Sequence, residues 1–98
     1  MYMRFEWDER KRRENLVKHG LDFLDARDIF EQETYTVIDD RFDYGETRFF
    51  TLGILNGVIV AVSHTESDEM VRIISLRKAE RYEQEIYYSA IRDWLGTA

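Results

Sequence analysis

The feature that most restricts the fold is the dipeptide Asn56-Gly57, which separates two apolar runs near the middle of the chain. The runs are TRFFTLGIL, residues 47–55, and VIVAVSHT, residues 58–65. An Asn-Gly dipeptide between such runs favours a two-residue hairpin turn, because both residues tolerate a positive φ. A third run, EMVRIISL at residues 69–76, follows after a short gap. We therefore expect consecutive antiparallel strands at the centre of the protein.

Three helices are expected around these strands. The first runs from Glu9 to His19, where Asp8 can cap the start and Gly20 suits the end. The second is short, begins after the candidate N-cap Asp22 and ends near Glu33. The third is predicted from apolar residues that recur at helical spacing at Ala79, Tyr82, Ile86, Ala90 and Trp94, before the stop signal Gly96.

Two further strands are predicted on either side of the first two helices. YMRFEW, residues 2–7, alternates apolar and charged side chains, and TYTVID, residues 34–39, is rich in β-branched residues. The expected order is βααββββα, an α+β fold in which an antiparallel sheet is packed by the N-terminal helices and the C-terminal helix. The chain has no proline-rich linker and no internal repeat, so we expect residues 1–98 to form a single domain.

Composition excludes several classes of function. The chain has no cysteine, so disulfides, a thiolate nucleophile and zinc-thiolate sites are impossible. The two histidines, His19 and His64, lack the spacing of metal ligands, so we expect no metal and no cofactor. No apolar run is long enough for a bilayer span, which favours a cytoplasmic protein without membrane contact. A net charge of -6 requires any polyanion site to be a local basic patch.

One candidate patch lies in the segment HTESDEMVRIISLRKAE, which starts at His64. Arg72 and Arg77 interrupt an apolar strand there, and Glu66 lies close to the preceding turn. A two-residue loop at Ser67-Asp68 would turn His64 toward the face of Arg77, whereas a three-residue loop would place it with Arg72. The sequence leaves both registers open. In either case an imidazole is expected near at least one guanidinium.

Such a set suits metal-free cleavage of RNA, in which the ribose 2'-hydroxyl attacks the adjacent phosphorus. The reaction needs a base for the 2'-hydroxyl, an acid for the leaving 5'-oxygen and fixed positive charge for the phosphorane. His64 or Glu66 would serve as base or acid, and Arg72 and Arg77 would supply the charge. The alternative is a surface histidine beside a turn, with both arginines in ordinary salt bridges.

A second candidate patch lies on the first predicted helix. Lys11, Asn15 and Lys18 fall on one helical face, and His19 lies at the C-terminal end, where the helix dipole favours its charged form. These side chains could bind a phosphate backbone. The alternative is a solvated helix with ordinary salt bridges.

Two blocks of sequence carry a more specific signal. The first consists of FEWD at residues 5–8, Asn15, KHG at residues 18–20, and Phe23, Ala26 and Phe30. The second consists of HTE at residues 64–66, RIISLRKAE at residues 72–80, Glu83 and Tyr87, with Asp39, Asp40, Glu46 and Arg48 between the blocks. Together they resemble the BrnT family of toxins, most strongly over residues 5–88. Residues 89–98 form a tail beyond the familiar motifs.

The resemblance implies a RelE-like fold and a ribonuclease toxin of a type II toxin-antitoxin system that acts on cellular RNA. It also implies a cognate BrnA-like antitoxin with a ribbon-helix-helix domain, and a complex that represses its own promoter. The leading hypothesis is therefore a metal-independent endoribonuclease. Its catalytic residues would be Arg72, Arg77, His64 and Glu66, and its RNA-binding residues Lys11, Lys18 and His19.

The antitoxin would contact DNA for the pair, because an acidic chain should not hold DNA unaided. It would silence the enzyme by covering the open sheet face or the exposed end of the last helix. Two rival hypotheses remain: an antitoxin-binding or co-repressor module with weak or lost catalysis, and an α+β domain with no nucleic-acid role.

Overall fold

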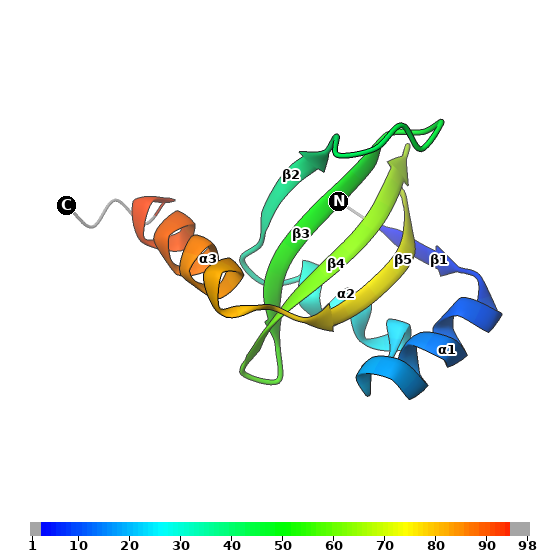
Figure 1. The fold of residues 1–98 in the computed structure, drawn as a ribbon, viewed down its shortest axis with the longest axis horizontal. Helices are drawn as coiled ribbons and strands as arrows, with labels where there is room; N and C mark the ends of the chain where they lie inside the picture. The colour runs from blue at the N-terminus through cyan, green and yellow to red at the C-terminus, as the bar shows by residue number, and fades with distance from the viewer. Residues whose placement is uncertain (1–2, 95–98) are drawn as a thin grey trace.

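The computed structural model describes residues 3–94 as a sheet with three α-helices (Figure 1). In chain order the elements are β1 (Arg4–Trp7), α1 (Glu9–His19), the 3-10 turn η1 (Phe23–Asp25), α2 (Ala26–Phe30), β2 (Tyr35–Asp39), β3 (Arg48–Leu55), β4 (Val58–Ser67), β5 (Met70–Lys78) and α3 (Arg81–Trp94). The α+β class predicted from the sequence is confirmed. Tyr2 and the expected stop signal Gly96 lie outside the described residues.

The five strands form one mixed sheet in the order β1-β5-β4-β3-β2. β2 to β5 pair as an antiparallel meander, whereas β1 pairs with β5 in parallel, Phe5 opposite Val71. The expectation of a purely antiparallel sheet is therefore wrong at this edge. Parallel neighbours need a long crossover connection, and the helices and three strands between β1 and β5 provide it.

The two turns of the meander set which side chains share a face. Asn56-Gly57 pairs Leu55 with Val58, and φ is positive at both turn residues, as predicted. The next turn has two residues, but they are Asp68 and Glu69, one position later than the loop considered above. Beyond it, His64 pairs with Ile73 while Ser63 pairs with Ser75, so Ile74 is an extra residue that forms a β-bulge.

The first helix begins and ends where its caps predict. Asp8 accepts a hydrogen bond from the Lys11 amide at the start of α1, and Gly20 adopts a left-handed φ of 71° at its end. Asp22 caps the following segment through the Leu24 amide, but that segment is a 3-10 turn followed by the short α2. The second helix thus ends at Phe30, earlier than expected.

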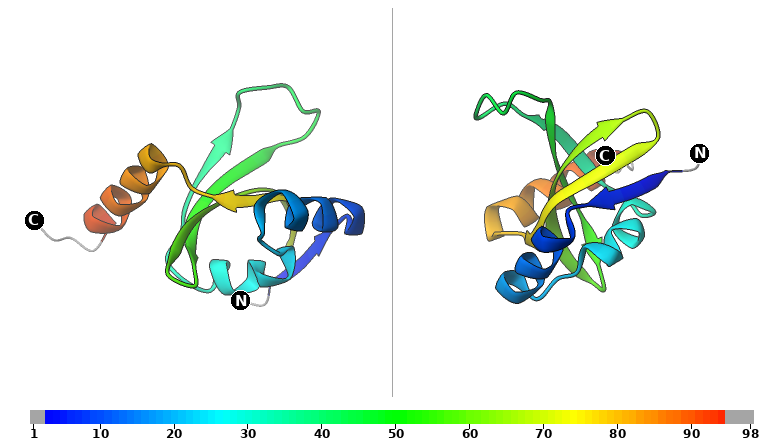
Figure 2. Two further views of the ribbon diagram at one scale, coloured as in Figure 1. Left: turned by 60° about the horizontal axis from the view of Figure 1, so that its bottom comes forward. Right: turned by 90° about the vertical axis from the view of Figure 1, so that its right-hand side faces the viewer.

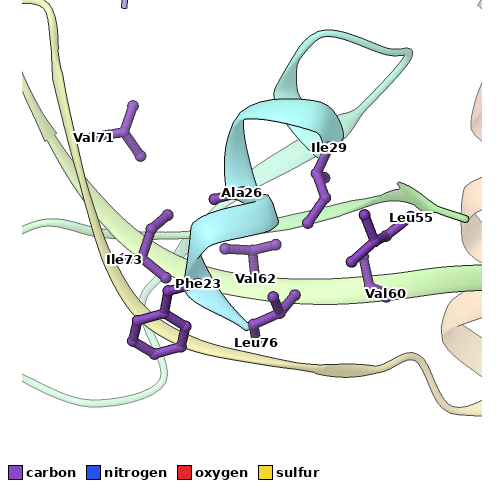
Figure 3. Close-up of a cluster of buried hydrophobic side chains, with 9 residues drawn as sticks. All are labelled: Phe23, Ala26, Ile29, Leu55, Val60, Val62, Val71, Ile73 and Leu76. Atoms are coloured by element: carbon purple, nitrogen blue, oxygen red, sulfur yellow. The ribbon is translucent and has the colours of Figure 1, made fainter. Parts of the chain in front are cut away.

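One face of the sheet carries the main hydrophobic core and is called the core face here. Strand side chains from this face pack against α2 and η1 (Figure 3). The cluster comprises Phe23, Ala26, Ile29, Leu55, Val60, Val62, Val71, Ile73 and Leu76. Gly53 allows the close approach of α2, because a Cβ there would lie 2.7 Å from the Ile29 side chain.

The opposite face is covered only at one end and is called the open face here. A smaller cluster holds α3 to it, formed by Leu52, Ile59, Ala61, Ala79 and Tyr87. Figures 1 and 2 show α3 projecting away from the sheet beyond this contact, so the rest of the face is not covered by any helix of residues 3–94. None of the described helices is long and apolar enough to cross a membrane.

Candidate functional site

The register places the polar side chains of the open face in rows across the sheet. One row contains Val37, Phe50, Ser63 and Ser75. The row nearer the β4–β5 turn contains Asp39, Arg48, Thr65, Arg72 and Glu6. Arg77 lies beside Ala61 in the direction of α3. Three arginines from β3 and β5 therefore share this face around a centre of serines and one phenyl ring.

The structure separates the catalytic residues proposed from the sequence onto the two faces. His64 shares the core face with Val62 and Ile73, whereas Arg72 and Arg77 lie on the open face. The two-residue turn opposes Arg72 to Thr65, and the bulge at Ile74 then shifts Arg77 to the same side. The expectation that either register would bring the imidazole near a guanidinium is therefore wrong.

His64 is a fully buried member of the core. Its ring stacks on Phe49 at 5.7 Å between centroids and meets the edge of Phe30 at 5.1 Å. Its Nε2 is 2.7 Å from the Thr51 hydroxyl, which is 2.7 Å from the Thr36 hydroxyl on β2. Because the imidazole has no exposed surface, it is not accessible to an RNA substrate in this conformation.

Burial lowers the pKa of His64 to about 4, so the ring is neutral at pH 7. Its Nδ1 has no hydrogen-bond partner in the described chain, and the nearest carboxylate oxygen belongs to Glu66 at 3.5 Å. Glu66 is exposed and pairs with Val71 on the core side of the sheet. Both groups therefore lie on the opposite side of the sheet from Arg72 and Arg77.

The Arg72 side chain is more accessible than those of Arg48 and Arg77. It is 47% exposed and lies 3.4 Å from Glu6, which is equally exposed. Such a pair contributes little to stability, because water screens both charges. Arg72 also lies close enough to Asp8 for their charges to interact. The guanidinium is therefore free to exchange a protein carboxylate for a phosphate.

Arg77 is held much more firmly than Arg72. Two of its nitrogens donate to the two carboxylate oxygens of Glu83 at 2.8 and 2.9 Å, and a third hydrogen bond reaches the Lys78 carbonyl. The Glu83 side chain is only 4% exposed. Hydrogen bonds from Arg77 lower the pKa of Glu83, and Glu83 raises the pKa of Arg77. Within residues 3–94, these three hydrogen bonds leave two of the five guanidinium N–H donors for a ligand.

Glu83 was not identified as a site residue from its chemistry, although a local signal exists. It lies at the third position of α3, and its carboxylate also accepts the backbone N–H of Glu80, which precedes the helix. This is half of a capping box, which favours glutamate at that position. The same carboxylate thus starts α3 and orients Arg77.

Arg48 is a further cation that the chemical argument missed. It lies over the Tyr44 ring at 4.0 Å and pairs with Glu46 at 3.2 Å. Tyr44 in turn donates to Asp39, whose pKa falls to about 2, mainly because Arg41 donates to it. Arg48 on β3 pairs with Asp39 on β2, and this register places its side chain on the open face.

The cations proposed on α1 are only partly connected to this face. Lys11 and Lys18 are exposed and His19 is half-buried. Besides the hydrogen bond from the Lys11 amide, the charges of Lys11 and Arg72 both lower the pKa of Asp8, so Lys11 is the α1 cation with an electrostatic link to the open face. Lys18 lies roughly 10 Å farther along the helix axis, and His19 follows it.

Asn15 points inward and cannot belong to a phosphate grip. It is buried, donates to the Leu76 carbonyl at 2.7 Å and accepts from the Leu76 amide at 3.1 Å. The expected face of Lys11, Asn15 and Lys18 is therefore interrupted. No group of three metal-ligating side chains is found among the described residues.

Comparison with known families identifies the class of protein to which this open-faced domain belongs. Residues 7–83 match the model of a family described as the ribonuclease toxin BrnT of type II toxin-antitoxin systems. No match was found among curated proteins. Because the match covers most of the chain, the protein belongs to the BrnT family. It is accordingly a ribonuclease toxin with an RNA substrate and an antitoxin partner.

Proposed function

We propose that the protein is a metal-independent endoribonuclease of RelE-like fold that binds RNA on the open face of its sheet. The observation that carries this proposal is the grouping of Arg48, Arg72 and Arg77 on the only sheet face that helices of the described chain leave uncovered. Guanidinium groups bind phosphate oxygens in pairs and retain their charge at any physiological pH. RNA backbone phosphates match that arrangement.

The scissile phosphate lies over Ser63 and Ser75, between Arg72 and Arg77. The Cα atoms of these two arginines are roughly 15 Å apart along β5, so that both long side chains can reach a phosphate between them. Arg72 supplies most of the uncompensated charge, because Glu83 already neutralises Arg77. Phe50 offers a ring for stacking of a neighbouring base.

Glu6 is the carboxylate nearest to Arg72 and accepts the proton of the 2'-hydroxyl in this proposal. The 2'-oxygen then attacks phosphorus and forms the 2',3'-cyclic phosphate. The bond from phosphorus to the 5'-oxygen breaks, and the 5'-oxygen takes a proton from solvent water to give the 5'-hydroxyl end. His64 and Glu66 take no part, because they lie on the core side. Lys11 extends the phosphate contacts along the edge of the sheet.

The test is cleavage of a defined RNA by the purified toxin in excess EDTA. We expect cleavage to survive EDTA and to leave 2',3'-cyclic ends. Glu6→Gln should lower the rate about 10²- to 10⁴-fold, whereas the matched variant Glu66→Gln should cleave normally. Loss of activity in EDTA, or equal losses in the two variants, would contradict the proposal.

A second function is favoured by one observation: Arg48, Arg72 and Arg77 each already have a carboxylate partner. A face with compensated charge suits an antitoxin-binding module with weak catalysis. Tight binding of the antitoxin without any RNA cleavage in the same assay would support that alternative.

The proposal also covers the type of antitoxin and the cellular location of the complex. The antitoxin carries a ribbon-helix-helix domain, and the complex represses its own promoter in the cytoplasm. Because this chain has a net charge of -6, the DNA contacts come from the antitoxin. Promoter DNA should therefore bind the antitoxin and the complex in a mobility-shift assay. Binding by the toxin alone would contradict this assignment.

A further inference from the structure

Exposed apolar side chains gather in a groove between β2 and α3. Four of the large apolar residues exposed in the described chain line its hollows, and we call them the β2–α3 groove: Tyr35, Val37, Tyr82 and Ile86. Val37 and Tyr82 are 39% and 58% exposed. Single exposed apolar residues are common, but a contiguous group of this kind marks an interaction surface.

One wall of the groove is the free edge of the sheet. β2 is the last strand in the sheet order and pairs only with β3, so its other backbone edge has no neighbouring strand among the described residues. The strand YTVID has neither lysine nor proline, which commonly protect such edges. An edge of this kind accepts an extended segment from another protein.

The charges around the groove select the kind of partner. Its hollows are lined by the carboxylates of Asp39, Asp40, Glu83, Glu85 and Asp93, and by only two arginines, Arg41 and Arg77. Those arginines are already bound to Asp39 and Glu83. The remaining charge is negative, which repels an RNA backbone and attracts a basic polypeptide.

We propose that the β2–α3 groove is the docking site of the antitoxin, which adds a basic, extended segment to the free edge of β2. Alternate residues of that segment face the open side and pack on Tyr35 and Val37, next to Tyr82 and Ile86 of α3. The basic character of the partner rests on the DNA-binding antitoxin of the proposed function. The segment also covers Arg77, which lines the same hollow, and thereby blocks the end of the RNA site.

The first test measures the affinity of the purified cognate antitoxin for Ile86→Lys. This change removes an apolar contact and adds a charge of the partner's own sign. We expect the dissociation constant to rise at least 100-fold, and the toxin to arrest growth even when the antitoxin is co-expressed. The control is Val17→Lys, since Val17 is an 89% exposed apolar residue of α1 and its replacement should leave antitoxin binding unchanged. Equal affinities for the two variants would overturn the proposal.

The second test follows amide hydrogen exchange of the unmodified toxin, so it does not depend on the folding of a variant. Amides within Tyr35–Asp39 should become protected in the complex. Absence of new protection in β2 would overturn strand addition.

The remaining outcomes separate other occupants and the proposed function. If Ile86→Lys weakens binding of a 2'-O-methyl RNA but not of the antitoxin, the groove binds RNA and the proposal is wrong. If it converts a dimer of the toxin to a monomer with no change in antitoxin affinity, the occupant is a second copy. If the toxin cleaves no RNA and Ile86→Lys still lowers its affinity for the antitoxin, the proposed ribonuclease activity is wrong but the docking site is supported.

Discussion

Arg72 and Arg77 belong to one strand and one sheet face, yet their surroundings give them different roles. Arg72 shares a solvated contact with Glu6, whereas Arg77 is clamped by a buried carboxylate. A solvated guanidinium can turn toward a developing phosphorane charge. A clamped guanidinium offers fixed donors and also neutralises the carboxylate beneath it.

Replacement of Arg72 by alanine should reduce the cleavage rate about 10²- to 10³-fold, because it removes charge that stabilises the transition state. The free energy of unfolding should change by no more than about 0.5 kcal/mol, as for other exposed substitutions. Single-turnover cleavage and urea unfolding measure the two effects. Arg13→Ala on α1 is the control for loss of one exposed positive charge. Full activity of Arg72→Ala would remove this residue from the site.

Arg77→Ala should behave differently, because it leaves Glu83 buried without its partner. We expect the free energy of unfolding to fall by about 2–3 kcal/mol, with activity lost as well. Arg77→Ala,Glu83→Gln should recover part of the stability, since the unpaired charge is gone. Urea unfolding measures the free energy of unfolding of both variants. Unchanged stability of the single variant would show that the clamp has no structural role.

His64 gives a prediction on pH. Its pKa is about 4 in the folded protein and 6.5 when unperturbed. Between these values the unfolded chain binds a proton that the folded chain does not, so stability falls as pH falls through this window. The loss by pH 4 is as much as roughly 3 kcal/mol.

Thermal melting of the wild type and of His64→Gln from pH 7.5 to pH 4.5 tests this sign. The difference in stability between the two proteins should shift in favour of the variant as the pH falls. The cleavage rate of the wild type should show no imidazole titration near pH 6.5, because His64 is neutral there. A rate that follows such a titration and loses it in His64→Gln would return His64 to the chemistry.

At the scale of elements, the Asn15 side chain of α1 forms hydrogen bonds to β5 that a neighbouring strand would otherwise form. β1 pairs with β5 only as far as Ile73, and Asn15 then satisfies both backbone groups of Leu76. Asn15→Leu should therefore lower the free energy of unfolding by about 2–3 kcal/mol, because a buried N–H and C=O lose their partners. Val17→Leu is the control at an exposed position of the same helix. Equal stabilities by urea unfolding would contradict this role.

The elements themselves were largely predictable, because their signals are local. Asp8 and Gly20 bound α1, and Asn56-Gly57 sets the central hairpin, each through the backbone conformation of a single residue or turn. The parallel pairing of β1 was not predictable in this way. It depends on packing between segments about sixty residues apart, which no local pattern records.

The candidate site was predicted only in part. From the sequence, Arg72 and Arg77 are expected to supply charge to one site, but in a regular strand they would lie on opposite faces, with one of them beside His64. The two-residue turn places Arg72 on the face opposite His64, and one extra residue, Ile74, then turns Arg77 to the face of Arg72. Because a β-bulge depends on packing against the surrounding core, a run of apolar residues gives no local signal for its position.

On the scale of the whole molecule, charge and shape assign different surfaces to different partners. The chain is acidic overall, yet the open face gathers Arg48, Arg72 and Arg77. Figure 1 shows α3 projecting away from the sheet. The groove between α3 and the edge of β2 is apolar and has an acidic lining. Arg77 lies where the two surfaces meet, so a partner in the groove can affect the RNA site directly.

The central claim is that RNA binds the open face and not the side of the molecule that holds His64. The most direct test is an NMR titration of the toxin with a 2'-O-methyl RNA, which cannot be cleaved by 2'-hydroxyl attack. We predict that the largest amide shifts fall on Ser63, Thr65, Arg72 and Ser75, and that those of Lys18 and His19 stay small. Shifts concentrated on α1 and α2, with the open face unchanged, would contradict the account.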